Sequence, residues 1–176
     1  AILAYRGDVY IGLHVDDWTS EDFDYADKHL RILSGLYGYL KPLDSIQPYR
    51  LEMGIKMKGA PIVDLDKYWM KSVTQTLNKD LKNQDINVLI NLASQEYANA
   101  ISWKEIKSCT IQIHFQELRN GKLIFVSYNA KKARGVMARE IIRQQLEKPD
   151  FIKELMPEGY VYNPTLSDKD NWYFTK

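Results

Sequence analysis

Residues 110–128 carry the pattern that most constrains the fold of this chain. Apolar side chains at positions 111, 113 and 115 alternate with polar ones at 112, 114 and 116, which is the period of a strand with one buried face. Asn120-Gly121 then precedes a β-rich run over residues 123–128, and this dipeptide is a strong short-range signal for a hairpin. The segment therefore predicts two antiparallel strands.

Further strands and helices are predicted on both sides of this hairpin. Residues 1–11 have a strand-like pattern, residues 87–92 form a short apolar run typical of a buried strand, and aromatic residues around Asn163-Pro164 predict a second hairpin. Helix starts are predicted at Thr19-Ser20-Glu21-Asp22, at Asp64 or Asp66, at Ser94, and near residue 130. Hairpins beside packed helices predict an α+β (mixed α/β) fold, and we expect residues 1–176 to form a single domain.

Composition narrows the class of protein. The longest apolar runs are far shorter than the roughly 20 residues of a membrane span, so we expect no membrane partner. The single cysteine, Cys109, cannot form an internal disulfide, which favours a cytoplasmic location. We expect Cys109 to be a small core residue, and a reactive thiol is the alternative. His14, His29 and His114 lack ligand spacing, so neither a metal site nor a cofactor is predicted.

The charged residues are unevenly distributed although the net charge is only +1. An acidic stretch near the start contrasts with a basic helix over residues 130–148. On that helix Lys132, Arg139 and Arg143 fall within a narrow arc, so the row can follow a nucleic-acid backbone. Lys131 and Arg134 lie toward its apolar side. A cation there needs a partner, which is either a carboxylate of the protein or a ligand phosphate.

The helix that begins near Ser20 is expected to end at Gly35, and Gly38, Lys41 and a second helix start follow. This order is typical of a helix–hairpin–helix-like element, in which hairpin amides face a DNA phosphate. A Cβ at the glycine positions would hold the phosphate away. The alternative is an ordinary helix that ends at glycine and is followed by a loop.

Two groups of polar residues are candidates for catalysis. Tyr49, Arg50 and Glu52 combine a phenol, a guanidinium and a carboxylate, which could bind a polar ligand or transfer protons. Asn91, Ser94 and Glu96 follow the predicted strand at 87–92, where open α/β sheets place ligands. The alternatives are a surface Arg–Glu pair and a helix cap at Ser94. The residues leave open whether the protein is an enzyme.

Four motifs in order make the chain resemble the YaaA family of bacterial peroxide-stress proteins. They are Ser34-Gly-Leu-Tyr-Gly38 with Pro42-Leu-Asp44, Gln47-Pro-Tyr-Arg-Leu-Glu-Met-Gly54, Asn91-Leu-Ala-Ser94 with Glu96-Tyr97, and Ala130-Lys-Lys-Ala-Arg-Gly135. The family's N-terminal portion, with a Ser-Pro-Ala-Lys-type motif, has no counterpart here. We therefore expect the chain to be the C-terminal two-thirds of a longer protein.

The resemblance implies a cytoplasmic protein that binds DNA and limits peroxide damage linked to free iron. By position it implies a basic cleft beside a helix–hairpin–helix element, formed by Gly35, Gly38, Lys41, Lys131, Lys132 and Arg134. Together with Arg139 and Arg143 these residues would bind duplex or branched DNA without reading its sequence. The alternative function is an enzyme that acts on a nucleic acid or nucleotide in a pocket of Tyr, Arg, Glu and Asn side chains.

Overall fold

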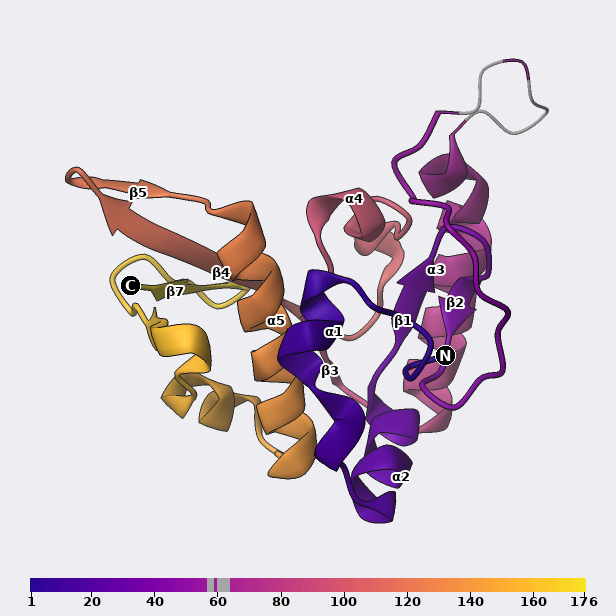
Figure 1. The fold of residues 1–176 in the computed structure, drawn as a ribbon, viewed down its shortest axis with the longest axis horizontal. Helices are drawn as coiled ribbons and strands as arrows, with labels where there is room; N and C mark the ends of the chain where they lie inside the picture. The colour runs from indigo at the N-terminus through magenta and orange to yellow at the C-terminus, as the bar shows by residue number, and fades with distance from the viewer. Residues whose placement is uncertain (57–58, 60–63) are drawn as a thin grey trace.

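A mixed five-stranded sheet forms the centre of the computed structural model, which describes residues 1–56, 59 and 64–176 (Figure 1). Its strands are β3 (Val88–Asn91), β4 (Cys109–Arg119), β5 (Lys122–Ile124), β6 (Val161–Tyr162) and β7 (Asn171–Thr175). β3 and β7 flank β4 in parallel, β5 pairs with the far end of β4 in antiparallel register, and β6 pairs antiparallel with β7. The predicted α+β fold and both predicted hairpins are confirmed, but the strand predicted over residues 123–128 ends at Ile124, because the chain turns into a helix at Ser127.

Helix α5 (Ser127–Arg143) covers one face of this sheet. Its Ala133 and Met137 belong to the same buried cluster as Ile113 and Phe115 of β4, which are the inward positions of the alternating pattern. The opposite positions of β4 are polar and half-buried. At the β4–β5 turn Asn120 and Gly121 both have positive φ, the conformation that this dipeptide favours.

The strand predicted over residues 1–11 is wrong, because residues from Asp8 onward form helix α1 (Asp8–Leu13). α1 lies along α5, and a Cβ at Gly12 or Gly135 would collide with the backbone of the other helix. This tertiary packing outweighs the local strand pattern. The predicted start of α2 (Ser20–His29) is confirmed, since Thr19 and Asp22 form a reciprocal capping box.

The helix–hairpin–helix-like element is also wrong. α2 ends at His29, and residues 30–40 continue as β1 (Ile32–Ser34) and β2 (Gly38–Leu40), an antiparallel pair. Ile32 and Leu40 of this hairpin both belong to one buried cluster. The apolar residues of this segment are therefore buried from a strand and not from the end of a helix. The described residues between β2 and α3 (Leu65–Asn83) contain no helix.

The remaining elements complete the right-hand side of Figure 1 and the C-terminal region. α3 packs Val73, Leu77 and Leu81 against the β1–β2 hairpin, and α4 (Gln95–Ala98) follows β3. Short 3₁₀ segments lie at Val15–Asp17, Trp103–Glu105, Pro149–Glu154 and Pro157–Gly159.

Cys109 is exposed at the start of β4, so its expected core position is wrong. None of the helices described is long and apolar enough to cross a membrane.

Candidate functional site

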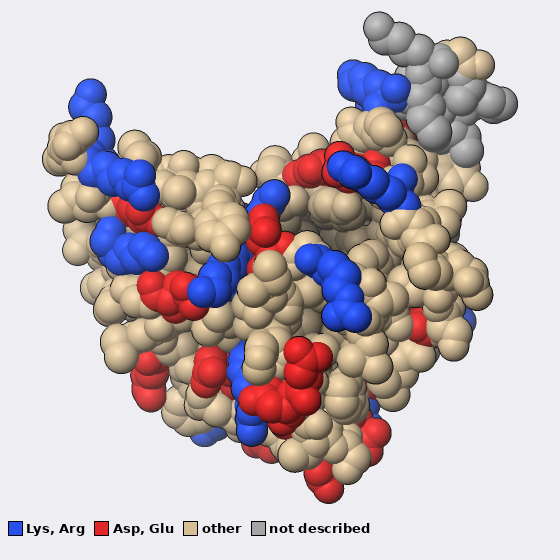
Figure 2. Space-filling model, in the orientation of Figure 1, with Lys and Arg blue, Asp and Glu red and all other residues tan. Residues whose placement is uncertain are grey.

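Figure 2 shows a hollowed face between the β4–β5 hairpin and the segment that precedes α3, with Lys and Arg side chains on both sides. Acidic side chains lie between them, so the face is mixed in charge. α1 and α5 both begin on this side of the molecule (Figure 1). The start of α5 has no acidic residue in its first turn, whereas α1 carries Asp8 there, so the positive end of α5 is the one that favours a negatively charged ligand.

The glycines of the predicted hairpin are used for packing. A Cβ at Gly35 would collide with the backbone of Leu51, and one at Gly38 would collide with the ring of Trp69. The Trp69 indole also donates a hydrogen bond of 2.9 Å to the Gly35 carbonyl. Lys41 is exposed, and its backbone amide donates to Asp44. These positions account for both glycines without a ligand.

Tyr49 belongs to a network of hydroxyl groups. Its hydroxyl lies 2.5 Å from that of buried Ser34 and 2.8 Å from that of Tyr5, which stacks on Tyr10. Burial raises the pKa of Tyr5 and of Tyr10, so both stay protonated at neutral pH. The network joins the N-terminal segment to β1.

The other catalytic candidates contact mainly local protein groups. Glu96 accepts a 2.8 Å hydrogen bond from the Gly54 amide, and Asn91 bonds to the Gln112 side chain and the Ala93 amide. Ser94 occupies the cap position of α4 without a side-chain cap bond. Arg50 and Glu52 are exposed. A catalytic role for these residues remains a prediction.

Tyr97, a member of one motif but not a predicted site residue, connects some of these candidates. Its pKa is raised by burial and then by the nearby Glu96, Tyr49 and Glu52 groups. Tyr49 and Glu52 of the first group of catalytic candidates therefore lie in the same region as Glu96 of the second group. Asn91 bonds elsewhere, to the strand that neighbours its own.

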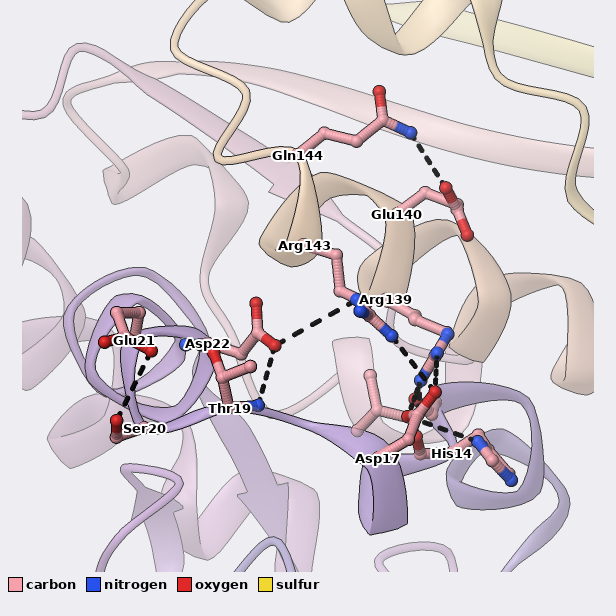
Figure 3. A network of polar contacts seen from close by, with 11 residues as sticks. His14, Asp17, Thr19, Ser20, Glu21, Asp22, Arg139, Glu140, Arg143 and Gln144 are labelled. Atoms are coloured by element: carbon pink, nitrogen blue, oxygen red, sulfur yellow. Dashed lines mark hydrogen bonds and ion pairs between the residues drawn. The ribbon is translucent and has the colours of Figure 1, made fainter.

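The predicted basic row is neutralised by carboxylates of the same chain. Lys132 lies 3.1 Å from Glu158. Arg139 forms two hydrogen bonds of 2.7 and 2.6 Å with Asp17, and Arg143 contacts the same carboxylate at 3.0 Å (Figure 3). The hydrogen bonds from Arg139 hold the pKa of Asp17 below its ordinary value. Arg139 and Arg143 thus connect α5 to the segment before α2, and Lys132 connects it to the Pro157–Gly159 segment.

Arg134 differs from these cations. It is only 9% exposed, and within the described ranges its guanidinium makes no hydrogen bond and no ion pair. Its guanidinium lies over the ring of Phe125, with the guanidinium carbon 5.8 Å from the ring centroid. Burial lowers its pKa. The sequence predicts either a carboxylate of the protein or a ligand phosphate as the partner of Arg134. The described residues supply no such carboxylate.

Lys131 lies one turn before Arg134 on α5 and has only a distant partner. Its ammonium is 3.9 Å from Asp8, and 46% of its side chain is exposed. Arg134 and Lys131 are therefore the cations of α5 that are best placed to meet an external anion.

Two site residues were missed from the sequence. Phe125 and Tyr128 are 57% and 58% exposed, and the Phe125 ring lies beside the Arg134 guanidinium. The sequence feature that could have identified them is the regular spacing of three residues between positions 125, 128, 131 and 134. Over the described part of the chain, no group of three or more His, Cys, Asp or Glu side chains could hold a metal ion.

Comparison with known proteins adds two findings. The model of the family described as "Peroxide stress protein YaaA" matches residues 1–166. A "UPF0246 protein" from Teredinibacter turnerae is 46% identical over 176 residues, which is 100% of this chain and 69% of that relative. These matches do not confirm the prediction that the chain is the C-terminal part of a longer protein.

Proposed function

Because the chain belongs to the YaaA family of peroxide-stress proteins, we propose that it is a stress protein that binds DNA phosphates in the cleft around Arg134. The observation that carries this proposal is Arg134, a nine-tenths buried residue whose buried Nε has no hydrogen-bond partner and whose guanidinium has no ion pair among the described residues. A buried charge without a partner is costly, and such a cost is retained where a ligand supplies the missing charge. Phosphate is the anion that guanidinium binds in a planar, bidentate geometry.

The geometry supports contact with the phosphate backbone and not with base edges. Lys131, one turn before Arg134 on α5, adds to the field at Arg134, whereas Lys132, Arg139 and Arg143 are held by Glu158 and Asp17. We therefore assign the main phosphate contact to Arg134 and treat the paired row as a weaker, long-range contribution. Binding of this kind is salt-sensitive and independent of sequence.

The test is a salt series of fluorescence anisotropy with a labelled duplex, comparing the parent with Arg134→Met. We expect the substitution to weaken binding at low salt by about tenfold or more, the worth of a hydrogen bond to a charged group. The slope of log affinity against log salt should fall by about 0.9, because one phosphate contact is lost. Arg143→Met is the matched control, since that charge is already paired with Asp17.

Two outcomes would contradict the proposal. One is a parent protein that does not bind duplex at low salt, and the other is an Arg134→Met variant that binds as the parent does. Unfolding curves of both variants establish that a lost affinity is not a lost fold. Removing an unpaired buried charge should leave the stability of Arg134→Met equal to or above that of the parent.

We further propose that this binding protects cytoplasmic DNA against damage linked to free iron. A protein that binds DNA phosphates releases the cations condensed there, and Fe²⁺ is such a cation. The parent should then reduce nicking of a plasmid by Fe²⁺ and peroxide, and Arg134→Met should protect less, in proportion to its weaker binding. Equal protection by the two proteins would show that protection against peroxide does not depend on DNA binding at Arg134.

A further inference from the structure

One side of the central sheet is left open. Helix α5 and the Pro149–Glu154 segment cover the other side, where alternate residues of β4 and β7 belong to the main buried cluster. The residues between them are half-buried or exposed, and in the described part of the chain they belong to no hydrophobic cluster. Because β3, β4 and β7 run parallel, and parallel strands are generally covered on both faces, the open side calls for a partner.

The strand register places the side chains of the open side in rows. Gln112 lies beside Asn171, and His114 stacks on Tyr173 with ring centroids 4.5 Å apart. The next row along β4 joins three strands, and the last row joins the two strands of the β4–β5 hairpin. These residues, which we call the outer face, are Gln112, Asn171, His114, Tyr173, Gln116, Thr175, Val161, Leu118 and Leu123.

The outer face contains no Asp, Glu, Lys or Arg, although these residues make up 27% of the chain. Charged residues are usual on a surface that faces water, whereas the core of a protein–protein interface is depleted of them and enriched in aromatic residues. Three apolar side chains at one end, Leu118, Leu123 and Val161, are 63%, 38% and 50% exposed. This composition is typical of a surface that another protein buries.

We infer that the outer face joins two copies of this chain around a twofold axis. Such an axis packs a patch against itself, so the groups of the patch must complement an identical set. Amide, hydroxyl and neutral imidazole groups each offer both a donor and an acceptor, so two outer faces can form hydrogen bonds with each other. No like charges oppose their contact. A protein that recognised charge would find no Asp, Glu, Lys or Arg here, which favours a second copy as the partner.

The size of the outer face fits a reversible dimer. β4 is an 11-residue strand. At about 3.4 Å per residue along it, and about 4.8 Å between the neighbouring strands β5, β4, β7 and β6, the face measures about 36 by 14 Å. Two such faces bury about 1,000 Å² in total, which is at the lower limit for a specific interface. We therefore expect a dissociation constant in the micromolar range.

The experiment is sedimentation equilibrium of the parent over a series of micromolar concentrations, compared with Gln116→Glu and Gln116→Lys. Gln116 lies in the row that joins three strands, so each substitution places two like charges near the axis. We expect the dissociation constant of each variant to rise by about tenfold or more, because like charges across an interface are unfavourable. An equimolar mixture of the two variants should dimerise again, since the charges are then opposite.

The matched controls are Gln75→Glu and Gln75→Lys, at an exposed position of α3. Both should dimerise as the parent does. Leu118→Asp is a second test of the outer face, because this exposed side chain can be changed without opening the core, and it should weaken the dimer in the same way. Circular dichroism of every variant establishes that a lost dimer is not a lost fold.

Three outcomes would overturn the inference. A dimer that the Gln116 and Leu118 variants leave intact would place the contact elsewhere on the molecule. Charged variants that stay monomeric when mixed would exclude a twofold axis near Gln116. A parent that is monomeric throughout the series would leave the outer face to a different protein. Because this face lies across the sheet from α5, none of these results bears on the proposed function.

Discussion

Arg134 and Arg139 lie five residues apart on α5 and have opposite surroundings. Arg139 is paired with Asp17 through two hydrogen bonds, which raise its pKa. Arg134 has no carboxylate partner in the described chain. Two arginines of one helix thus divide into a structural cation and a cation available to a ligand.

Glu117 shows how a buried carboxylate is stabilised at the scale of one residue. It accepts hydrogen bonds from Asn129, Tyr160 and Arg119, at 2.7 to 3.1 Å. These bonds, led by that of Asn129, lower its pKa from 4.5 to about 2. They connect the β4–β5 hairpin to the start of α5 and to Tyr160.

We predict that Glu117→Gln lowers the thermal midpoint at pH 7. Because the folded-state pKa is depressed, the stabilisation from the charged form is fully present above pH 4.5 and is lost as the pH falls toward 2. The difference in midpoint between parent and variant should therefore shrink over that range. Scanning calorimetry at pH 7, 4 and 2.5 measures it, with exposed Glu154→Gln as a control that should not change. A difference that is constant with pH would contradict the assignment.

At the scale of elements, the contact of α1 with α5 depends on two glycines. Gly12 and Gly135 let the two helix backbones approach more closely than side chains would allow. Lys131 and Arg139 add contacts to Asp8 and to the C-terminal carbonyls of α1 at the two ends of this interface. Gly135 of the fourth family motif is therefore a packing residue.

We predict that Gly135→Ala lowers the free energy of unfolding by about 1–3 kcal/mol, the usual cost of overpacking. The sign is informative, because alanine inside a helix would otherwise stabilise it by up to about 1 kcal/mol. Gly7→Ala is the control, since a Cβ there meets no atom within 4 Å. Urea unfolding of the three proteins measures both effects, and an equal or more stable Gly135→Ala protein would contradict the close approach.

At the scale of the whole molecule, the net charge of +1 conceals internal pairing. The acidic stretch near the start supplies Asp17 and Asp22, which lie beside Arg139 and Arg143 of α5 (Figure 3). Two carboxylates of the acidic stretch are therefore partners of two arginines of the basic stretch. Among the described residues, Arg134 is the arginine of α5 that this pairing leaves without a carboxylate partner.

We predict that Asp17→Asn releases part of the paired row. Duplex affinity should rise a few-fold at low salt, with a steeper salt dependence, because Arg139 and Arg143 lose the carboxylate that holds them. Stability should fall in the same variant, since the link between α5 and the segment before α2 is weakened. Asp24→Asn, which removes an exposed charge of the same stretch, is the control. An unchanged salt slope would limit the phosphate contacts to the cleft.

Local patterns were sufficient where neighbours along the chain determine the conformation. The alternation over residues 111–116, the Asn120-Gly121 turn and the helix start at Thr19 were all predicted correctly from the sequence, because each depends on contacts within a few residues. The family resemblance was also readable, since its motifs are continuous segments. These observations establish the α+β class and the family.

Tertiary structure decided the rest. α1 forms against α5 where the local pattern predicts a strand, and residues 30–40 form a hairpin where the spacing fits a helix, because each buries its apolar side against distant elements. Charge pairing is equally non-local: Asp17 and Arg139 are 122 residues apart. Composition shows which charges exist, but only the packed chain determines that Arg139 is neutralised and that Arg134 is buried without a partner.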